Sequence, residues 1–488
     1  MEKAYQATIG LEIHAELITG SKMFCSCRNN PEETRPNFDV CPICLGHPGT
    51  LPTLNAEAVR HVLRVGLAVG GKLADFTEWD RKNYFYPDIP KGYQISQYKY
   101  PLVSGGLLCG VEIERIHLEE DTAKSTHDIH DKKSLVDFNR SGRPLMELVT
   151  KPVIHDAASA SAFARELRLL LRTLKAGRAD MEKGQMRIEA NVSVAPSGSD
   201  KLGVKTEVKN LNSFKSVEKA VAFEIERQTS LLQSGGTVVQ ETRGWDENRS
   251  ETYSQRSKES SHDYRYFPEP DLPKLKISEI PFFAEEALRK DFPELPWNKR
   301  ARYKKDFALT DKEIAVFLES PSAADYFEAV ASGLKGDEKR IRLAANYILN
   351  NYLGKVRAAS SRDSTGEIEM SPVDKISPAS FAELVSLVAA RKISSTGAGA
   401  LIEAALKTKG NFSASFEELA GKLNLIQKSG SAEIGPVVDE VIKANASVVA
   451  EYRAGKKASL QFLIGQVMKV TKGSANPEAV SRLLTERM

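Results

Sequence analysis

The chain has 488 residues, of which 41% are hydrophobic and 27% are charged. This balance predicts a globular protein with sizeable cores, divided into about three domains. Its five cysteines are too sparse for a disulfide-stapled secreted protein and favour a reducing compartment. No apolar run approaches the roughly 20 residues of a membrane span, and the first 17 residues resemble neither a signal peptide nor a transit peptide. We therefore expect a cytoplasmic protein that does not enter a membrane.

The positive charge is concentrated near the C-terminal end. The formal net charge is only +3, yet residues 451–488 contain seven lysines and arginines against three acidic residues. A basic terminal module of this kind is typical of a surface that meets nucleic-acid phosphates.

Strand and helix patterns interchange over the first part of the chain. Polar and apolar residues alternate, as in strands, in four segments: residues 9–17, 111–120, 185–194 and 204–211. Apolar residues recur at the helical period in residues 55–70, which end at a glycine pair, and in residues 156–178. These elements predict a mixed α and β domain.

Two loop-rich stretches predict domain boundaries. The first is the proline-rich stretch 291–299, after which the pattern is almost wholly helical, and the second is at 407–418. The sequence thus predicts an α+β fold with a mixed domain around a largely antiparallel sheet, a helical connector domain and a small helical tail domain. Their predicted ranges are 1–293, 294–408 and 409–488.

Side chains alternate across a strand, so each alternating segment has one polar face. The polar faces of three segments carry Glu12, His14 and Glu16; Arg187, Glu189 and Asn191; and Lys205, Glu207 and Lys209. Antiparallel sheets commonly have one face in water, and this ordinary explanation is favoured for any single strand. Three such strands together favour a functional face, because carboxylates and a histidine can ligate a metal and lysines suit phosphate.

Two further stretches have both a functional and an ordinary explanation. Glu119, Glu120 and Asp121 are consecutive acids, which repel one another unless a cation lies among them; the alternative is a solvated strand end. Residues 80–98 interleave basic and aromatic residues, which suits base stacking and phosphate binding. An aromatic core with a turn is an equally good explanation of that stretch.

Two other stretches are judged to be non-functional. Residues 66–72 read "GLAVGGK", but Leu73 replaces the Ser or Thr of a P-loop, and the stretch ends a helix instead of following a strand. We expect no P-loop nucleotide site. Cys109 lies in the apolar stretch "GLLCGVE" and is expected to be a buried core thiol.

The other four cysteines form two close pairs at residues 25–44. Such spacing serves redox chemistry, a disulfide loop or a metal site. In a cytosolic chain it best matches a structural zinc knuckle, although C-x-C is tighter than the commonest spacing. Four thiolates leave no open position for catalysis, so we expect the loop to brace the preceding strand. The expected zinc ligands are Cys25, Cys27, Cys41 and Cys44.

Long segments of the chain together resemble one family. They are "IGLEIHAEL", "DRKNYFYPDIPKGYQISQ", "HLEEDTAKSTH", "DFNRSGRPLMELV", "EVKNLNSF" and "DYRYFPEPDL". These segments resemble the B subunit of the aspartyl/glutamyl-tRNA amidotransferases, the GatB family. The tail segment "EYRAGKKASLQFLIGQVMKVTKGSANPEAV" resembles that family's YqeY-like tRNA-binding domain. The resemblance covers nearly the whole chain.

The resemblance implies an ATP-dependent carbon–nitrogen ligase that uses glutamine as amido donor. Family members use ATP and Mg²⁺ to phosphorylate the side-chain carboxylate of misacylated Glu-tRNA(Gln) or Asp-tRNA(Asn), and ammonia then displaces phosphate. A GatA-like amidase supplies the ammonia through an internal channel, and a GatC-like small subunit completes the heterotrimer. Which misacylated tRNA this chain uses, or whether it uses both, stays open.

The resemblance also implies roles for residues of the first domain, the catalytic cradle. The implied catalytic residues are Glu12, His14, Glu119 and Glu120, and either of the last two would serve the metal. The implied Mg²⁺ ligands are Glu12, His14, Glu120 and Glu189. The expected ATP- and phosphate-binding residues are Arg81, Lys82, Asn83, Arg187, Lys205, Glu207 and Lys209. The expected tRNA-binding residues are Lys456, Lys457, Lys469 and Lys472.

The polar strand face agrees with this chemistry, because phosphoryl transfer asks a protein mainly for positioning and charge compensation. Two alternatives belong to other classes. A zinc-containing tRNA-binding protein or chaperone without catalysis would not turn over ATP with misacylated tRNA. A metal-dependent nuclease using Glu12, Glu120 and Glu189 would cleave tRNA with Mg²⁺ and no ATP.

Overall fold

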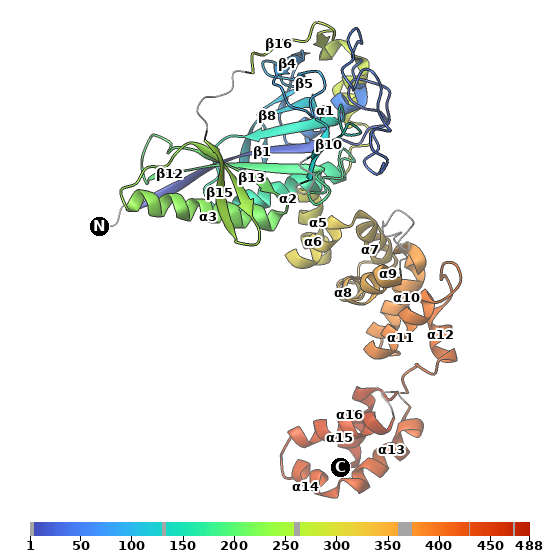
Figure 1. Ribbon diagram of the computed structural model, residues 1–488. Coiled ribbons are helices and arrows are strands. Elements are labelled where there is room, and N and C mark those ends of the chain that lie inside the picture. Colours follow the sequence, from blue (N-terminus) through green and yellow to red (C-terminus); the bar gives the residue numbers. More distant parts are fainter. Residues whose placement is uncertain (1–3, 129–132, 258–263, 360–372, 429, 472–473) are drawn as a thin grey trace. The chain divides into compact units, whose positions relative to one another are not determined.

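The computed structural model describes residues 4–128, 133–257, 264–359, 373–428, 430–471 and 474–488 (Figure 1). The chain divides into two units, Met1–Pro296 and Trp297–Met488. Within the described ranges, no helix combines the length and apolar character that a membrane crossing requires.

The first strand, β1 (Tyr5–Glu16), is central to a ten-stranded sheet in the first unit. Its alternation holds as the sequence predicts, because Ile9, Leu11 and Ile13 are buried on one face. Among the described strands the β13–β14 pair is parallel and the other pairs of this sheet are antiparallel. The order is β15 (Glu251–Ser257), β14 (Glu241–Asp246), β13 (Thr206–Leu211), β12 (Met186–Pro196), β1, β11 (Pro144–Thr150), β8 (Val111–Glu120), β6 (Val103–Ser104) and β2 (Lys72–Leu73), with β7 (Leu107–Leu108) beside β8.

Helices α2 (Ala157–Thr173) and α3 (Phe214–Gln233) lie along one face of this sheet (Figure 1). Asp156 caps α2 by accepting a hydrogen bond from the Ser159 backbone N–H. The helix predicted to reach residue 178 ends at Thr173 because Lys175 adopts a φ of 55°, which a helix does not accommodate. These helices leave the opposite face of β1, β11 and β12 for polar side chains.

Smaller elements surround the main sheet. Helix α1 (Ala56–Ala68), capped by Asn55, packs near β8. The three-stranded sheet is formed by β4 (Asp80–Asn83), β5 (Tyr93–Ser96) and β16 (Phe267–Pro268). The two-stranded pairs are β9 (Lys124–Asp128) with β10 (Lys133–Asp137) and β3 (Phe76–Thr77) with β17 (Leu275–Lys276), and α4 spans Glu285–Arg289. The pairing of β4 with β16 brings the chain near residue 80 beside the chain near residue 267.

The prediction that Cys109 is a buried core thiol is wrong. Cys109 is exposed, and with Gly110 it forms the two-residue turn between β7 and β8. Both turn residues have positive φ, 52° and 77°, as a type I′ hairpin turn requires. The apolar stretch is therefore a hairpin.

The second unit is built of helices, as the sequence predicts. They are α5 (Pro296–Phe307), α6 (Asp311–Glu319), α7 (Pro321–Gly333), α8 (Glu338–Tyr347), α9 (Leu353–Ala359), α10 (Pro378–Ala389), α11 (Ser395–Leu406), α12 (Phe416–Lys422), α13 (Ser431–Ala444), α14 (Ala446–Arg453), α15 (Ala458–Val470) and α16 (Pro477–Arg487). One π-helical turn, Ile348–Tyr352, joins α8 to α9.

Two apolar clusters divide this unit. The first runs from Tyr303 to Ala420, and the second from Ile434 to Leu484. Phe412 and Phe416 belong to the first cluster, so the chain that follows residue 409 packs with the preceding helices. Two phenylalanines of the loop-rich stretch 407–418 are thus core residues, and the predicted domain boundary at 409 stays a prediction.

Candidate active site

Strand register places four polar side chains in one row across the main sheet. Arg187 on β12 lies opposite His14 on β1, His14 lies opposite Glu147 on β11, and Glu147 lies opposite His117 on β8. Directly opposed residues of an antiparallel pair have neighbouring side chains on the same face. Glu147 Oε2 is 3.3 Å from His14 Nε2 and 3.1 Å from His117 Nε2, so this carboxylate joins the two imidazoles.

Further carboxylates surround His14. Its Nε2 is 3.9 Å from Glu12 Oε1 and 3.9 Å from Glu119 Oε1. Glu12 lies opposite Glu189 on β12, and Ser96 Oγ donates a hydrogen bond of 2.9 Å to Glu119. The polar face predicted from alternation is therefore assembled, with His117 and Glu119 contributed by β8.

Two groups of side chains here have metal-ligand geometry. Glu12, His14 and Glu147 offer ligand atoms that all lie within 4.8 Å of one another, and so do His117, Glu119 and Glu147. Carboxylate oxygens with imidazole nitrogens suit hard or borderline divalent cations. The two groups share Glu147, which the sequence analysis did not single out.

The charges of this face perturb one another. Burial alone would lower the pKa of the His14 imidazole, but Glu147, Glu119 and Glu12 raise this pKa to about 9. Burial and the charge of Glu147 raise the pKa of Glu12. Burial alone would raise the pKa of Glu147, but His117 and His14 hold this pKa well below its usual range. The protonated imidazole of His14 compensates only part of the negative charge of the surrounding carboxylates, so the site favours a divalent cation.

A cavity of about 410 Å³ opens over this face, and basic groups line it beside the acids. Lys209 Nζ is 2.9 Å from Glu189, and the Arg187 guanidinium is 2.9 Å from Asp121. Burial alone would lower the pKa of Lys82, but the charge of Glu119 and those of other neighbouring groups raise this pKa. Of the predicted ATP- and phosphate-binding residues, those that line the cavity are Lys82, Arg187, Glu207 and Lys209.

Aromatic rings form another part of the wall. Tyr98 and Tyr266 are stacked with centroids 4.5 Å apart and planes 12° apart. Lys82 Nζ lies 5.0 Å from the centroid of the Tyr264 ring. Tyr84, Tyr98, Tyr264 and Tyr266 all line the cavity, so part of the aromatic stretch 80–98 does face it.

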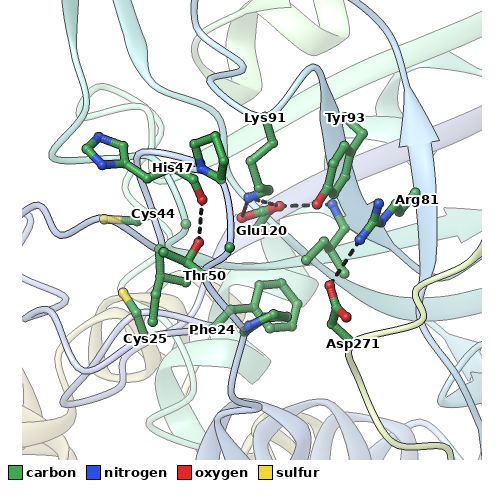
Figure 2. A pocket seen from close by; sticks show the side chains of 17 residues that line it. Phe24, Cys25, Cys44, His47, Thr50, Arg81, Lys91, Tyr93, Glu120 and Asp271 are labelled. Atoms are coloured by element: carbon green, nitrogen blue, oxygen red, sulfur yellow. Dashed lines mark hydrogen bonds and ion pairs between the residues drawn. The ribbon is translucent and has the colours of Figure 1, made fainter.

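Glu120 does not join the other predicted metal ligands. Neighbouring residues of a strand face opposite sides, and Glu120 lines a second cavity of about 220 Å³. There Lys91 Nζ is 2.6 Å from Glu120 Oε1 (Figure 2). The Ile95 backbone N–H donates to the same oxygen. Its predicted place among the Mg²⁺ ligands therefore disagrees with the geometry.

Three predicted phosphate-binding residues also lie outside the first cavity. Arg81 lines the second cavity and donates two hydrogen bonds to Glu269, at 2.7 and 2.8 Å. Asn83 Nδ2 donates to the carbonyl oxygens of Tyr264 and Arg265, which fixes the segment before β16 that carries the cavity tyrosines Tyr264 and Tyr266. Lys205 is exposed and precedes the first residue of β13, so the strand geometry does not aim it at the cavity.

The four paired cysteines come together as one cluster. The sulfurs of Cys25, Cys27, Cys41 and Cys44 all lie within 4.8 Å of one another. A hydrogen bond from Cys25 lowers the pKa of the Cys44 thiol to about 5 and raises that of Cys25. Figure 2 shows Cys25 and Cys44 on one side of the second cavity and the Lys91–Glu120 pair on another. Four sulfurs at this spacing suit tetrahedral zinc.

The predicted tRNA-binding lysines are at the surface of the tail where the structure describes them. Lys456, Lys457 and Lys469 are exposed, and Lys456 forms an ion pair of 2.8 Å with Glu451. Lys472 lies outside the described residues.

Several residues that line the cavity were not predicted from the sequence, among them His117, Glu147, Tyr264 and Tyr266. His117 is two residues before Glu119, so strand alternation was a signal that could have found it and separated Glu119 from Glu120. Glu147 lies in "PLMELVT", whose other residues are apolar or buried, so no alternation marks it. Tyr264 and Tyr266 precede a two-residue strand, and the sequence carries no periodic signal there.

Comparisons with known proteins identify the family of the chain. The family model described as the GatB/GatE catalytic domain matches residues 7–281, and the one described as the GatB domain matches residues 325–488. The chain is 41% identical to a protein of Persephonella marina and 42% identical to proteins of Caldanaerobacter subterraneus and Moorella thermoacetica, over at least 99% of each chain. All three are named as the B subunit of aspartyl/glutamyl-tRNA(Asn/Gln) amidotransferase. The two family models match most of both units, and the three relatives match over at least 99% of their length. The chain therefore belongs to the GatB family.

Proposed function

We propose that this chain is the B subunit of a glutamine-dependent tRNA amidotransferase and converts Glu-tRNA(Gln), Asp-tRNA(Asn) or both to the amidated forms. The observation that carries the proposal is one cavity in which Glu12, His14, Glu147 and Glu119 face Lys82 and other basic groups. The names of its relatives, which cover the whole chain, supply the substrate class.

The reaction needs an activated carboxylate, because oxide is a poor leaving group. The substrate's side-chain oxygen attacks the γ-phosphorus of ATP, and the bond from that phosphorus to ADP breaks. Ammonia then forms a bond to the acyl carbon, phosphate leaves with the former carboxylate oxygen, and the new amide loses a proton to solvent. Both steps require compensation of charge on phosphate oxygens and close positioning of the reactants.

The residues of the cavity fit this task. Mg²⁺, when bound, would neutralise charge on the phosphates of ATP, and we propose Glu12, His14, Glu119 and Glu147 as its site, with Glu189 beside them. The mixed oxygen and nitrogen donors and their burial fit a divalent cation. Lys82, Arg187 and Lys209 would bind phosphate oxygens, and the stacked Tyr98 and Tyr266 would receive a base of ATP or of the tRNA end.

Other proposed parts of this function lie away from the cavity. The four cysteines would hold a structural zinc ion that leaves no position open for chemistry. The tail lysines would contact tRNA phosphates. We also propose that a GatA-like amidase releases ammonia from glutamine and that a GatC-like subunit completes the complex. A cytoplasmic location remains a prediction from cysteine usage.

The test is to co-purify the chain with its GatA-like and GatC-like partners and to assay both misacylated tRNAs with ATP and glutamine. We expect His14→Ala and Glu12→Ala to abolish amidation while leaving tRNA affinity unchanged, and Lys205→Ala, outside the cavity, to remain active. Full activity of His14→Ala would refute the metal assignment. Cleavage of tRNA with Mg²⁺ and without ATP would instead support a nuclease.

A further inference from the structure

We propose that Lys22 is a positioning residue of the four-cysteine site. Its ammonium group donates an N–H···S hydrogen bond to Cys44 and balances the negative charge of a zinc–thiolate cluster. The inference rests on the zinc site proposed above and adds a residue that determines how tightly that site holds its metal.

Contacts of Lys22 reach both cysteine pairs. Its side chain is fully buried, with 0% exposure. Lys22 Nζ lies 3.7 Å from Cys44 Sγ and 3.2 Å from the carbonyl oxygen of Phe138. The backbone N–H of the same residue donates to the carbonyl oxygen of Cys27 at 2.9 Å. One residue thus connects the pair Cys25–Cys27 to the pair Cys41–Cys44.

The charge of Lys22 requires an anion. A buried ammonium group without a counter-charge is strongly unfavourable, yet no carboxylate of the described residues forms an ion pair with it, and its polar contacts are a sulfur and a carbonyl. Glu120, which approaches the neighbouring Gly142, is already paired with Lys91. Four thiolates around one Zn²⁺ carry excess negative charge, so the metal-bound cluster supplies the missing anion.

The backbone at Gly142 makes room for this contact. Gly142 has a φ of +80°, and a Cβ there would lie 3.3 Å from Cys44 Cβ and 3.7 Å from Lys22 Cδ. Its carbonyl oxygen accepts a hydrogen bond of 2.7 Å from the backbone N–H of Met23. A side chain at this position would crowd Cys44, and the positive φ by itself favours glycine, so glycine lets the backbone pass close to Cys44 beside the lysine stem.

Hydrogen bonds to metal-bound ligands tune the metal, and their loss typically costs 10- to 100-fold in affinity. We therefore expect Lys22→Met, which preserves length and removes the ammonium group, to weaken zinc binding by about 10- to 100-fold. Loss of the N–H···S bond raises the electron density on the thiolate, so the thiolate-to-cobalt charge-transfer band of the Co²⁺-loaded full chain should move to lower energy.

The matched control is Ser141→Ala, because Ser141 Oγ donates to the backbone oxygen of the same Cys44 at 3.0 Å but carries no charge. Zinc affinity is measured by competition with a chromophoric chelator, and the cobalt band by absorption. We expect Lys22→Met to change both and Ser141→Ala to leave the band unchanged. Should Lys22→Met not fold, Lys22→Gln, which keeps a polar contact for the Phe138 carbonyl but has no positive charge, is expected to show the loss of zinc affinity.

The two proposals fail in different ways. Wild-type chain that binds no zinc would refute the zinc site itself. Wild-type chain that binds zinc, with Lys22→Met or Lys22→Gln equal to it in affinity and cobalt band, would refute the role of Lys22 alone. A loss of affinity equal in Lys22→Met and Ser141→Ala, with an unchanged band, would reduce Lys22 to a merely structural residue and likewise overturn the inference.

Discussion

Replacing Glu147 by glutamine tests the centre of the proposed active site. The change preserves shape but removes the carboxylate that joins His14 to His117. The pKa of His14, about 9 against a usual 6.5, reflects favourable interactions that exceed the burial cost by roughly 3 kcal/mol. Glu147 is the largest favourable contributor. We expect Glu147→Gln to lower the pKa of His14 by roughly one to two pH units.

The sign of the stability effect follows from the same shift. A raised folded-state pKa means that charged His14 stabilises the metal-free wild type fully below about pH 6.5, and that this stabilisation is lost as pH rises through about 9. The gap in unfolding free energy between wild type and Glu147→Gln should therefore shrink over that range. Histidine-labelled NMR titration of metal-free chain measures the pKa, and denaturant unfolding at several pH values measures the gap.

The same substitution should raise the Mg²⁺ concentration needed for half-maximal amidation by at least about 10-fold, as loss of metal-site support typically does. Glu224→Gln is the control, because Glu224 is also a buried carboxylate and pairs with Arg227 at 2.6 Å and Arg243 at 3.6 Å, away from His14. This control should cost stability and leave the pKa of His14 and the Mg²⁺ dependence unchanged. An unaltered His14 pKa in Glu147→Gln would refute the reasoning.

Three other predictions concern the rest of the chain. Replacing Lys456, Lys457 and Lys469 together by glutamate should weaken tRNA binding and reduce the salt dependence of that binding, without changing ATP hydrolysis. Fluorescence anisotropy at several salt concentrations measures the tRNA affinity. A variant with the same affinity as the wild type at all salt concentrations would argue against the tail surface. Cys41→Ser should lose zinc, measured by atomic absorption, and lower the melting temperature, whereas Cys109→Ser at the exposed hairpin should do neither. Phe327 is fully buried in the first apolar cluster, and Phe327→Ala should lower the free energy of unfolding by about 3–5 kcal/mol. Denaturant unfolding followed by circular dichroism measures this loss. A loss below about 1 kcal/mol would contradict the packing.

Local patterns in the sequence predict much of this molecule, and pairing between distant strands accounts for most of what they miss. Alternation along β1 correctly separates Ile13 from His14, because strand geometry alone determines it. Which residue lies opposite His14 depends on the register of β1 with β11, a strand more than a hundred residues later, and no local pattern encodes that register.

The errors near the site have particular causes. Naming Glu120 among the Mg²⁺ ligands, with the choice between Glu119 and Glu120 left open, overlooks alternation within one strand, which sends the two carboxylates to different cavities. Lys205 continues the alternation of the sequence, but β13 begins one residue after it. Cys109 has apolar neighbours because both arms of its hairpin are strands, and the turn itself leaves no apolar signature.

The placement of Glu119 and Glu120 on opposite sides of β8 has a consequence for insertions and deletions. A shift of β8 by one residue against β11 would turn every side chain of β8 to the opposite face, so that His117 and Glu119 would leave the cavity that holds His14 and Glu147. An inserted residue therefore has to be absorbed at the exposed Cys109–Gly110 turn before it reaches Glu119. Natural length variation in this neighbourhood should gather at that hairpin tip.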